Sequence, residues 1–109
     1  MSAKTGEITN GRAPFVMVSK KLTEDPDIPA SAKSVYMALC RFSDNMTRVA
    51  NPGRRTIRQV ACVSDSTLSR SLEALEEAGY IRITPNYRKD FHGNYTGERL
   101  SNSYHIENV

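Results

Sequence analysis

The sequence predicts an α+β fold, mainly α, with one short strand, three helices and a C-terminal β-hairpin. Three stretches between residues 30 and 79 repeat apolar residues every three to four positions, as one face of a helix does. Two later stretches alternate apolar and polar residues with a period of two, as half-buried strands do. A chain of 109 residues has room for one such domain.

The N-terminal part is expected to hold an arm and the short strand. Residues 1–14 are mostly small and polar, so we expect a flexible arm ahead of a domain at residues 15–109. The apolar run Phe15–Val18 is typical of a strand or an extended segment. Two prolines then exclude a regular helix over residues 24–29, because proline lacks an amide hydrogen and restricts the residue before it.

The first helix is expected over Ala30–Phe42. Its apolar residues fall at helical spacing and form one stripe: Ala32, Val35, Tyr36, Leu39 and Cys40. We expect the helix to end near Ser43. The segment Asn51–Gly53 contains a proline and a glycine, and is therefore expected to form a turn.

A second, short helix is expected over residues 55–62. Its apolar residues Ile57, Val60 and Ala61 are expected to face inward. Only a few residues around Val63 separate it from the third helix. Because a connection this short does not allow antiparallel packing, the two helices must cross steeply, as in a helix-turn-helix.

The third helix is expected to begin after Ser64. The hydroxyl of this serine can accept a hydrogen bond from an unpaired amide of the first turn. Leu68, Leu72 and Leu75 occupy positions i, i+4 and i+7, so they form the inner face. Gly79 is expected to end the helix, since glycine readily adopts the left-handed cap conformation.

Two strands are expected after the third helix. They cover residues 80–84 and 103–107. Ile81 and Ile83 share the inner face of the first strand, and Tyr104 and Ile106 share that of the second. The stretch 85–102 has no helical period, so it is expected to form the long tip of a hairpin.

Residues spread over this region resemble those of a known family. The matching residue types are Pro52, Thr56, Ile57, Val63–Ser64, Thr67–Leu68, Arg70, Leu72, Leu75 and Gly79–Ile81. They resemble winged helix-turn-helix domains over nearly the whole chain. Asn102, Tyr104 and Ile106 further resemble the closing strand of a subgroup found in plasmid and phage replication proteins. The resemblance implies that the third helix lies in the major groove of DNA and that the hairpin is the wing.

Two positions depart from that family. Arg58 stands where the family usually has a small residue, often alanine, which allows the helices to cross closely. Cys62 stands where the family usually has glycine, which suits a backbone with positive φ. We expect Arg58 to extend around the helix contact and Cys62 to accept a strained or altered turn.

The outer side of the third helix carries the predicted base-reading residues. Small hydroxyls and one arginine occupy its N-terminal half: Ser64, Ser66, Thr67, Ser69 and Arg70. Arginine pairs with guanine bidentately, and hydroxyls reach bases or phosphates. The alternative is a solvated face on which Arg70 pairs with Glu73 or Glu77.

Further cations are predicted to contact the DNA backbone. Arg88 and Lys89 lie in the loop between the strands, which suits contact with phosphates or the minor groove. Arg54 and Arg55, at the start of the second helix, are expected to face the backbone. For all four residues, a solvated role is the alternative.

Composition permits a polyanionic partner and gives no sign of catalysis. The net charge is +3, and the isoelectric point is about 9.0. His92 and His105 have no further ligand at metal spacing and no phosphate-binding loop occurs, so no enzyme, metal, cofactor or small-molecule ligand is expected. No membrane span or signal peptide occurs, which favours the cytoplasm. Cys40 and Cys62 are then expected to be reduced, buried and inert.

The sequence therefore predicts sequence-specific binding of double-stranded DNA. The subgroup resemblance favours a role in plasmid or phage replication initiation or DNA processing, and a transcriptional regulator is the alternative. An alternative of a different class is a winged helix used for protein–protein contact, for which Glu73, Glu76 and Glu77 argue. A monomer and a homodimer both stay open, and no membrane partner is expected.

Overall fold

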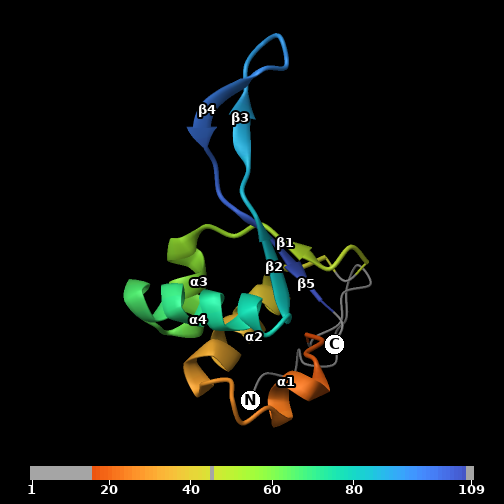
Figure 1. The fold of residues 1–109 in the computed structure, drawn as a ribbon, viewed down its shortest axis with the longest axis vertical. Coiled ribbons are helices and arrows are strands. Elements are labelled where there is room, and N and C mark those ends of the chain that lie inside the picture. Colours follow the sequence, from red (N-terminus) through yellow and green to blue (C-terminus); the bar gives the residue numbers. More distant parts are fainter. Residues whose placement is uncertain (1–15, 45, 108–109) are drawn as a thin grey trace, which may run out of the picture.

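A computed structural model describes residues 16–107 of the chain, except Asn45. In these residues it has four helices and two antiparallel sheets, so the α+β class is confirmed (Figure 1). The helices form the lower body of the molecule in Figure 1, and a two-stranded hairpin projects from that body. The predicted arm, residues 1–14, lies outside the described residues.

The helix α2, Ala30–Phe42, is the centre of the core and has the predicted bounds. Its whole predicted stripe is buried, and so is Ala38. The helix packs against α3, α4 and β1, because the stripe is wide enough to face several neighbours. Burial raises the pKa of the Cys40 thiol and of the Tyr36 hydroxyl. The predicted burial of Cys40 is therefore confirmed.

The helices α3, Arg54–Ala61, and α4, Asp65–Glu77, form the helix-turn-helix and both lie against α2. The buried side chains of the pair are Ile57, Leu68, Ser71, Leu72 and Leu75. The predicted inner face of α4 is confirmed. Since all three leucines are buried, the opposite side of α4 is left to solvent.

A left-handed cap ends α4, as predicted. Gly79 has a φ of 84°, and its amide donates to the carbonyl of Glu76 at 3.1 Å. The amide of Tyr80 donates to the carbonyl of Leu75 at 2.9 Å. These two bonds are the Schellman motif, which pairs carbonyls that the end of a helix leaves free. The motif turns the chain from α4 directly into the sheet.

Three strands form the main sheet, in the order β1-β5-β2. They are β1, Val49–Ala50, β2, Ile81–Thr84, and β5, Ser103–Ile106. The register pairs Ile81 with Ile106 and Ile83 with Tyr104. Directly opposed residues share a face of a sheet, so the four predicted inner residues lie together against the core.

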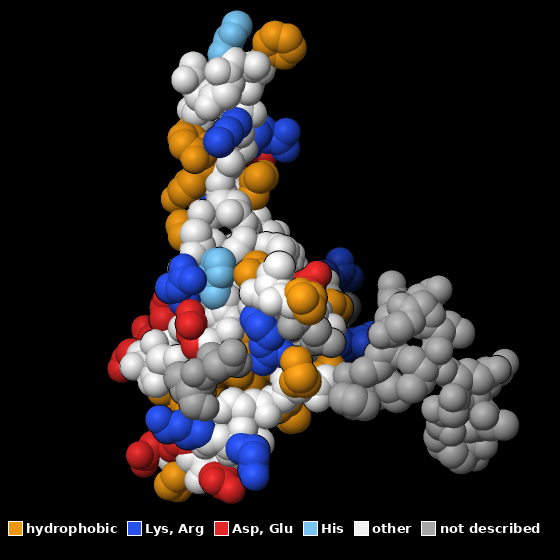
Figure 2. Space-filling view, turned by 90° about the vertical axis from the view of Figure 1, so that its right-hand side faces the viewer, with side chains coloured by type: hydrophobic (Ala, Val, Ile, Leu, Met, Phe, Trp, Pro, Cys, Tyr) orange, Lys and Arg blue, Asp and Glu red, His pale blue; other side chains and the backbone are white. Residues whose placement is uncertain are grey.

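A second antiparallel pair continues outward from the sheet. It consists of β3, Tyr87–Lys89, and β4, Tyr95–Arg99, and we call residues 87–99 the distal hairpin. The distal hairpin projects along the longest axis of the molecule, which spans 50 Å (Figure 1). Every residue of both strands is exposed, and hydrophobic side chains lie along its shaft (Figure 2). The sequence predicted a loop here. Both faces of the hairpin are exposed, so its strands lack the alternation of apolar and polar residues that indicates a half-buried strand.

The predicted N-terminal strand is wrong. Residues 16–18 have no regular structure, and Phe15 lies outside the described residues. The third strand is β1 instead, whose Ala50 is fully buried against the core. A short apolar run predicts that a segment is buried, but not whether it is a strand, a helix or irregular chain. Here Val18 packs on the core in irregular chain.

Two further differences concern the helices. The short helix α1, Lys20–Glu24, was not expected, because it buries Leu22 alone and shows no period. Val60 was predicted to face inward, but it is 42% exposed. Ile57 and Ala61, four positions apart, fill the narrow inner face of α3, which leaves Val60 at its outer edge. Within the described residues, no helix has the length and apolar character that crossing a bilayer requires.

Candidate nucleic-acid interface

The turn between α3 and α4 contains a residue in a strained conformation. Cys62 has φ 60° and ψ 47°, the left-handed region, and its amide donates to the carbonyl of Arg58. A residue with a Cβ pays about 1–2 kcal/mol there. Of the two outcomes predicted from its departure from glycine, a strained or an altered turn, the structure has the strained one. The predicted burial of the Cys62 thiol is wrong, because this backbone conformation leaves its side chain exposed.

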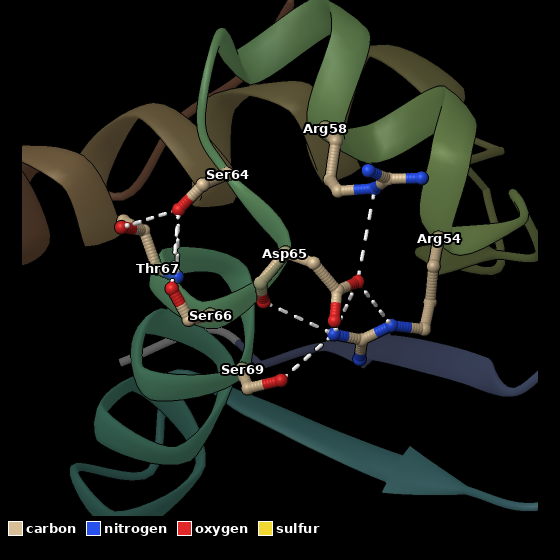
Figure 3. Close-up of polar contacts among 7 residues, drawn as sticks. All are labelled: Arg54, Arg58, Ser64, Asp65, Ser66, Thr67 and Ser69. Atoms are coloured by element: carbon tan, nitrogen blue, oxygen red, sulfur yellow. Dashed lines mark hydrogen bonds and ion pairs between the residues drawn. The ribbon is translucent and has the colours of Figure 1, made fainter.

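Ser64 caps α4 and gathers the neighbouring hydroxyls. Its Oγ accepts from the amide of Thr67 at 3.2 Å, which confirms the predicted cap. The same Oγ donates to Thr67 Oγ1 at 3.0 Å and lies 3.3 Å from Ser66 Oγ (Figure 3). Three of the predicted DNA-contacting hydroxyls thus form one cluster at the start of α4.

Arg54 bridges α3 to α4. Its Nε and Nη2 donate to Asp65 Oδ1 at 3.2 and 3.0 Å, and Nη2 also donates to Ser69 Oγ at 2.7 Å (Figure 3). Both ionic side chains are about half exposed, so the pair contributes little to stability on its own. Its geometric effect is larger, because one guanidinium holds the first turns of two helices together.

Arg58 extends around the helix crossing, as its departure from a small residue predicted. Its side chain is 37% exposed, and its Nε lies 3.7 Å from Asp65 Oδ1. That separation is too long for a hydrogen bond, and Nε is buried with no hydrogen-bond partner among the described residues. Asp65 is therefore hydrogen-bonded to Arg54, and Arg58 contributes its positive charge near the same carboxylate.

The outer face of α4 presents Arg70 to solvent. Its Nη2 donates to Thr67 Oγ1 at 3.4 Å, a long and weak hydrogen bond. Among the described residues Arg70 forms no ion pair, so pairing with Glu73 or Glu77 is not what the structure has. Its guanidinium keeps its charge uncompensated beside the hydroxyl cluster.

The predicted cations of the hairpin are spread over its two faces. Arg88 Nε forms an ion pair with Glu98 Oε1 at 2.9 Å. Lys89 Nζ lies 5.2 Å from the centre of the Tyr95 ring, a cation–π contact. Arg99 belongs to the same loop stretch, in which the sequence favoured Arg88 and Lys89 over it as DNA-contacting cations. It sits at the end of β4, where its Nη2 donates to Asn102 Oδ1 at 2.9 Å and no carboxylate of the described residues neutralises it.

A hollow of about 520 Å³ joins the base of the hairpin to the start of α3. Its lining includes Pro52, Arg54, Arg99, Leu100, Ser101, Asn102 and Tyr104. Arg54 and Arg99, which are distant in sequence, therefore face one concave surface. No sequence signal pointed to this, because the polar stretch that contains Arg99 shows no strand period. Arg55, the remaining predicted cation, is exposed on α3.

A buried tyrosine fixes the corner between α4 and the sheet. The Tyr80 hydroxyl donates to Asp25 Oδ2 at 2.7 Å, and its ring meets Tyr36 edge-on at 6.2 Å. Burial and the bond to Asp25 raise the pKa of Tyr80 to about 12. The same bond lowers the pKa of Asp25. The corner thus sets the direction in which β2 leaves the body toward the hairpin.

One comparison with known proteins finds a match. A family model described as a helix-turn-helix domain matches residues 27–81, about half of the chain. The matched segment runs from the turn before α2 to the first residue of β2, and so contains α2, α3, the turn and α4. No curated protein and no solved structure matches the chain. In the described residues no group of histidine, cysteine and carboxylate side chains is placed to hold a metal ion.

Proposed function

The chain belongs to the helix-turn-helix domain family, a membership that suggests DNA binding, and from it we propose sequence-specific binding of double-stranded DNA by a winged helix-turn-helix. In this proposal α4 enters the major groove, and the distal hairpin is the wing. The chain acts by binding, and no catalytic step is proposed.

The observation that carries the proposal is the uncompensated Arg70 on the outer face of α4. It lies one turn beyond a cluster of small hydroxyls, opposite the buried leucines. A helix that presents short polar side chains and one arginine fits the width of the major groove. The amides of its first turn add an end that favours anions.

Two more features support this orientation. The Arg54–Asp65 bridge fixes the crossing of α3 and α4, so the reading helix has a rigid support. The carboxylate of Asp65 would repel phosphate, but two arginines lie against it. The wing then offers Lys89 and Arg99 to the backbone, and beside them Arg88, which is held in an ion pair with Glu98.

The finer role that we propose is replication initiation or DNA processing in a plasmid or phage. The support for it is the resemblance of Asn102, Tyr104 and Ile106 to the closing strand of that subgroup. A transcriptional regulator is the second candidate, because the same fold serves both functions.

The rival of a different class, a protein–protein module, loses part of its support. It rested on three glutamates near the end of α4. The Glu76 Oε2 atom accepts from the amide of Ile83 at 3.3 Å, so this carboxylate is engaged with β2. Only Glu73 and Glu77 remain as an acidic surface.

Titration with a mixed-sequence duplex at low salt, followed by a salt series, tests the proposal. If about five phosphates are neutralised, the slope of log K against log salt is expected to be roughly −4 to −5. Arg82→Ala is the charge-matched control, because Arg82 pairs with Glu107 on the sheet, and it should leave the slope unchanged. No binding at low salt, or a flat salt response, contradicts the proposal.

A further inference from the structure

The distal hairpin has two faces of different chemistry. Its strands pair Tyr87 with Arg99 and Lys89 with Tyr95, with a register shift between the two pairs, and directly opposed residues share a face. We call these four residues the aromatic face. The shift does not separate the pairs, because Tyr87, Lys89 and Tyr95 line one hollow. The opposite face carries Arg88 and Glu98, whose charges cancel in their ion pair at 2.9 Å. The positive charge of the hairpin strands therefore gathers on the aromatic face.

The two rings of the aromatic face are exposed to solvent. Tyr87 is 43% exposed and Tyr95 is 68% exposed, whereas the three other tyrosines of the chain are buried. Hydrophobic side chains are visible along the shaft of the hairpin in Figure 2, far from the core. Two such rings on a projecting ribbon lie outside the core, so they suit contact with a ligand.

A hollow lies between the two rings. It has a volume of about 480 Å³ and is lined by Pro85, Asn86, Tyr87, Lys89 and Tyr95. This volume is within the range of roughly 300–1,000 Å³ that is typical of small-molecule sites in proteins. Asn86 is held in place by its Nδ2, which donates to Ser101 O and Ser103 Oγ at 2.8 Å each. Its Oδ1 accepts no hydrogen bond from the described residues.

We propose that the aromatic face binds single-stranded DNA, with unpaired bases stacked on Tyr87 and Tyr95 and phosphates held by Lys89 and Arg99. Exposed aromatic rings interleaved with cations are the chemistry that binds single strands without reading sequence. A base within a duplex is covered on both sides by its neighbours, so stacking of this kind requires an unpaired base. Asn86 lines the hollow, and its Oδ1 atom can accept from the amino group of a base there.

The aromatic face lies apart from the reading face of α4, but it shares Lys89 and Arg99 with the wing proposed to contact the duplex backbone. On this inference the two cations hold the phosphates of an open strand, while α4 holds the duplex. The inference goes beyond the proposed function and does not depend on Arg70.

Binding of a labelled single-stranded oligonucleotide, followed by fluorescence anisotropy, tests the inference in the full chain. Tyr87→Ala and Tyr95→Ala should each weaken binding by about tenfold or more, since each removes a stacking ring. Tyr95→Phe keeps the ring and should retain binding. Phe91→Ala is the matched control, because Phe91 is 98% exposed at the tip and lies outside the aromatic face.

Tyrosine emission gives a second readout. The chain has no tryptophan, so its emission comes from five tyrosines, of which only Tyr87 and Tyr95 are exposed. Stacked bases should quench the emission of the parent protein, and the quenching should fall in each alanine variant. Circular dichroism of each variant checks that the body stays folded.

The outcomes separate this inference from the proposed function. If the parent does not bind the single strand, or if both alanine variants bind it as tightly as the parent does, the inference is wrong and duplex binding by α4 is unaffected. If the duplex is not bound but the single strand is, with loss in the alanine variants, the inference holds and the proposed function fails.

Discussion

Each helix of the body contributes at least one buried side chain to a single core, whereas the strands of the distal hairpin contribute none. The body is held by burial, and the hairpin is held by its backbone ladder, one ion pair, one cation–π contact and exposed side-chain hydrogen bonds. Exposed contacts of these kinds stabilise little. Substitutions in the body should therefore change stability, while substitutions in the hairpin should change binding.

The largest expected effect is in the core of the body. Leu75→Ala should lower the free energy of unfolding by about 2–5 kcal/mol, because Leu75 is fully buried where α4 packs on α2. Leu100→Ala, at the base of the hairpin, should change it by less than about 0.5 kcal/mol, because Leu100 is 42% exposed. Urea unfolding measures both. Equal losses in the two variants contradict the division between body and hairpin.

A smaller effect of opposite sign is expected at the turn. Cys62→Gly should raise the free energy of unfolding by about 0.5–1 kcal/mol, since glycine removes the strain of φ 60° but adds entropy to the unfolded chain. Cys62→Ala keeps a Cβ and should leave stability unchanged within about 0.5 kcal/mol. If glycine destabilises the protein in the same unfolding assay, the turn is not strained.

The smallest effect depends on pH. Because the Tyr80 bond lowers the pKa of Asp25 from its usual value of 3.8, it stabilises the fold above that pH and this contribution is lost as the pH falls below it. Tyr80→Phe removes the bond. The stability difference between parent and variant should therefore shrink as the pH falls below 3.8.

Tyr87→Phe is the control for that measurement. It removes the same hydroxyl from an exposed ring on the hairpin, and it should show no such dependence on pH. A difference between parent and Tyr80→Phe that stays constant across the acid range contradicts the role given to Asp25.

The body was predictable from the sequence where burial produces a period. The stripe of α2 predicted both of its ends, and Ser64 and Gly79 predicted the two ends of α4. Prediction failed where a helix is too short for its apolar residues to show which face points inward. Val60 lies in a helix of eight residues, and α1 buries a single leucine.

The sequence predicted most residues of the candidate site but not the contacts between them. The sequence singled out Arg70 and the hydroxyls of α4 but gave no sign that Arg54 bonds to Asp65, because that contact crosses the turn. The hairpin strands escaped prediction since neither of their faces is buried. Arg99 joins the concave surface through a strand pairing that no local pattern specifies.

The measurement that tests the DNA account most directly compares two substitutions on two duplexes. A cognate site is first selected from a random duplex library, and affinities are then measured for this site and for random duplex. Arg70→Ala should lose roughly 1–3 kcal/mol on the cognate site and much less on random DNA. Lys89→Ala should weaken both about equally and reduce the salt slope by about one. Equal loss on both duplexes for Arg70→Ala would contradict the assignment of α4 as the reading helix.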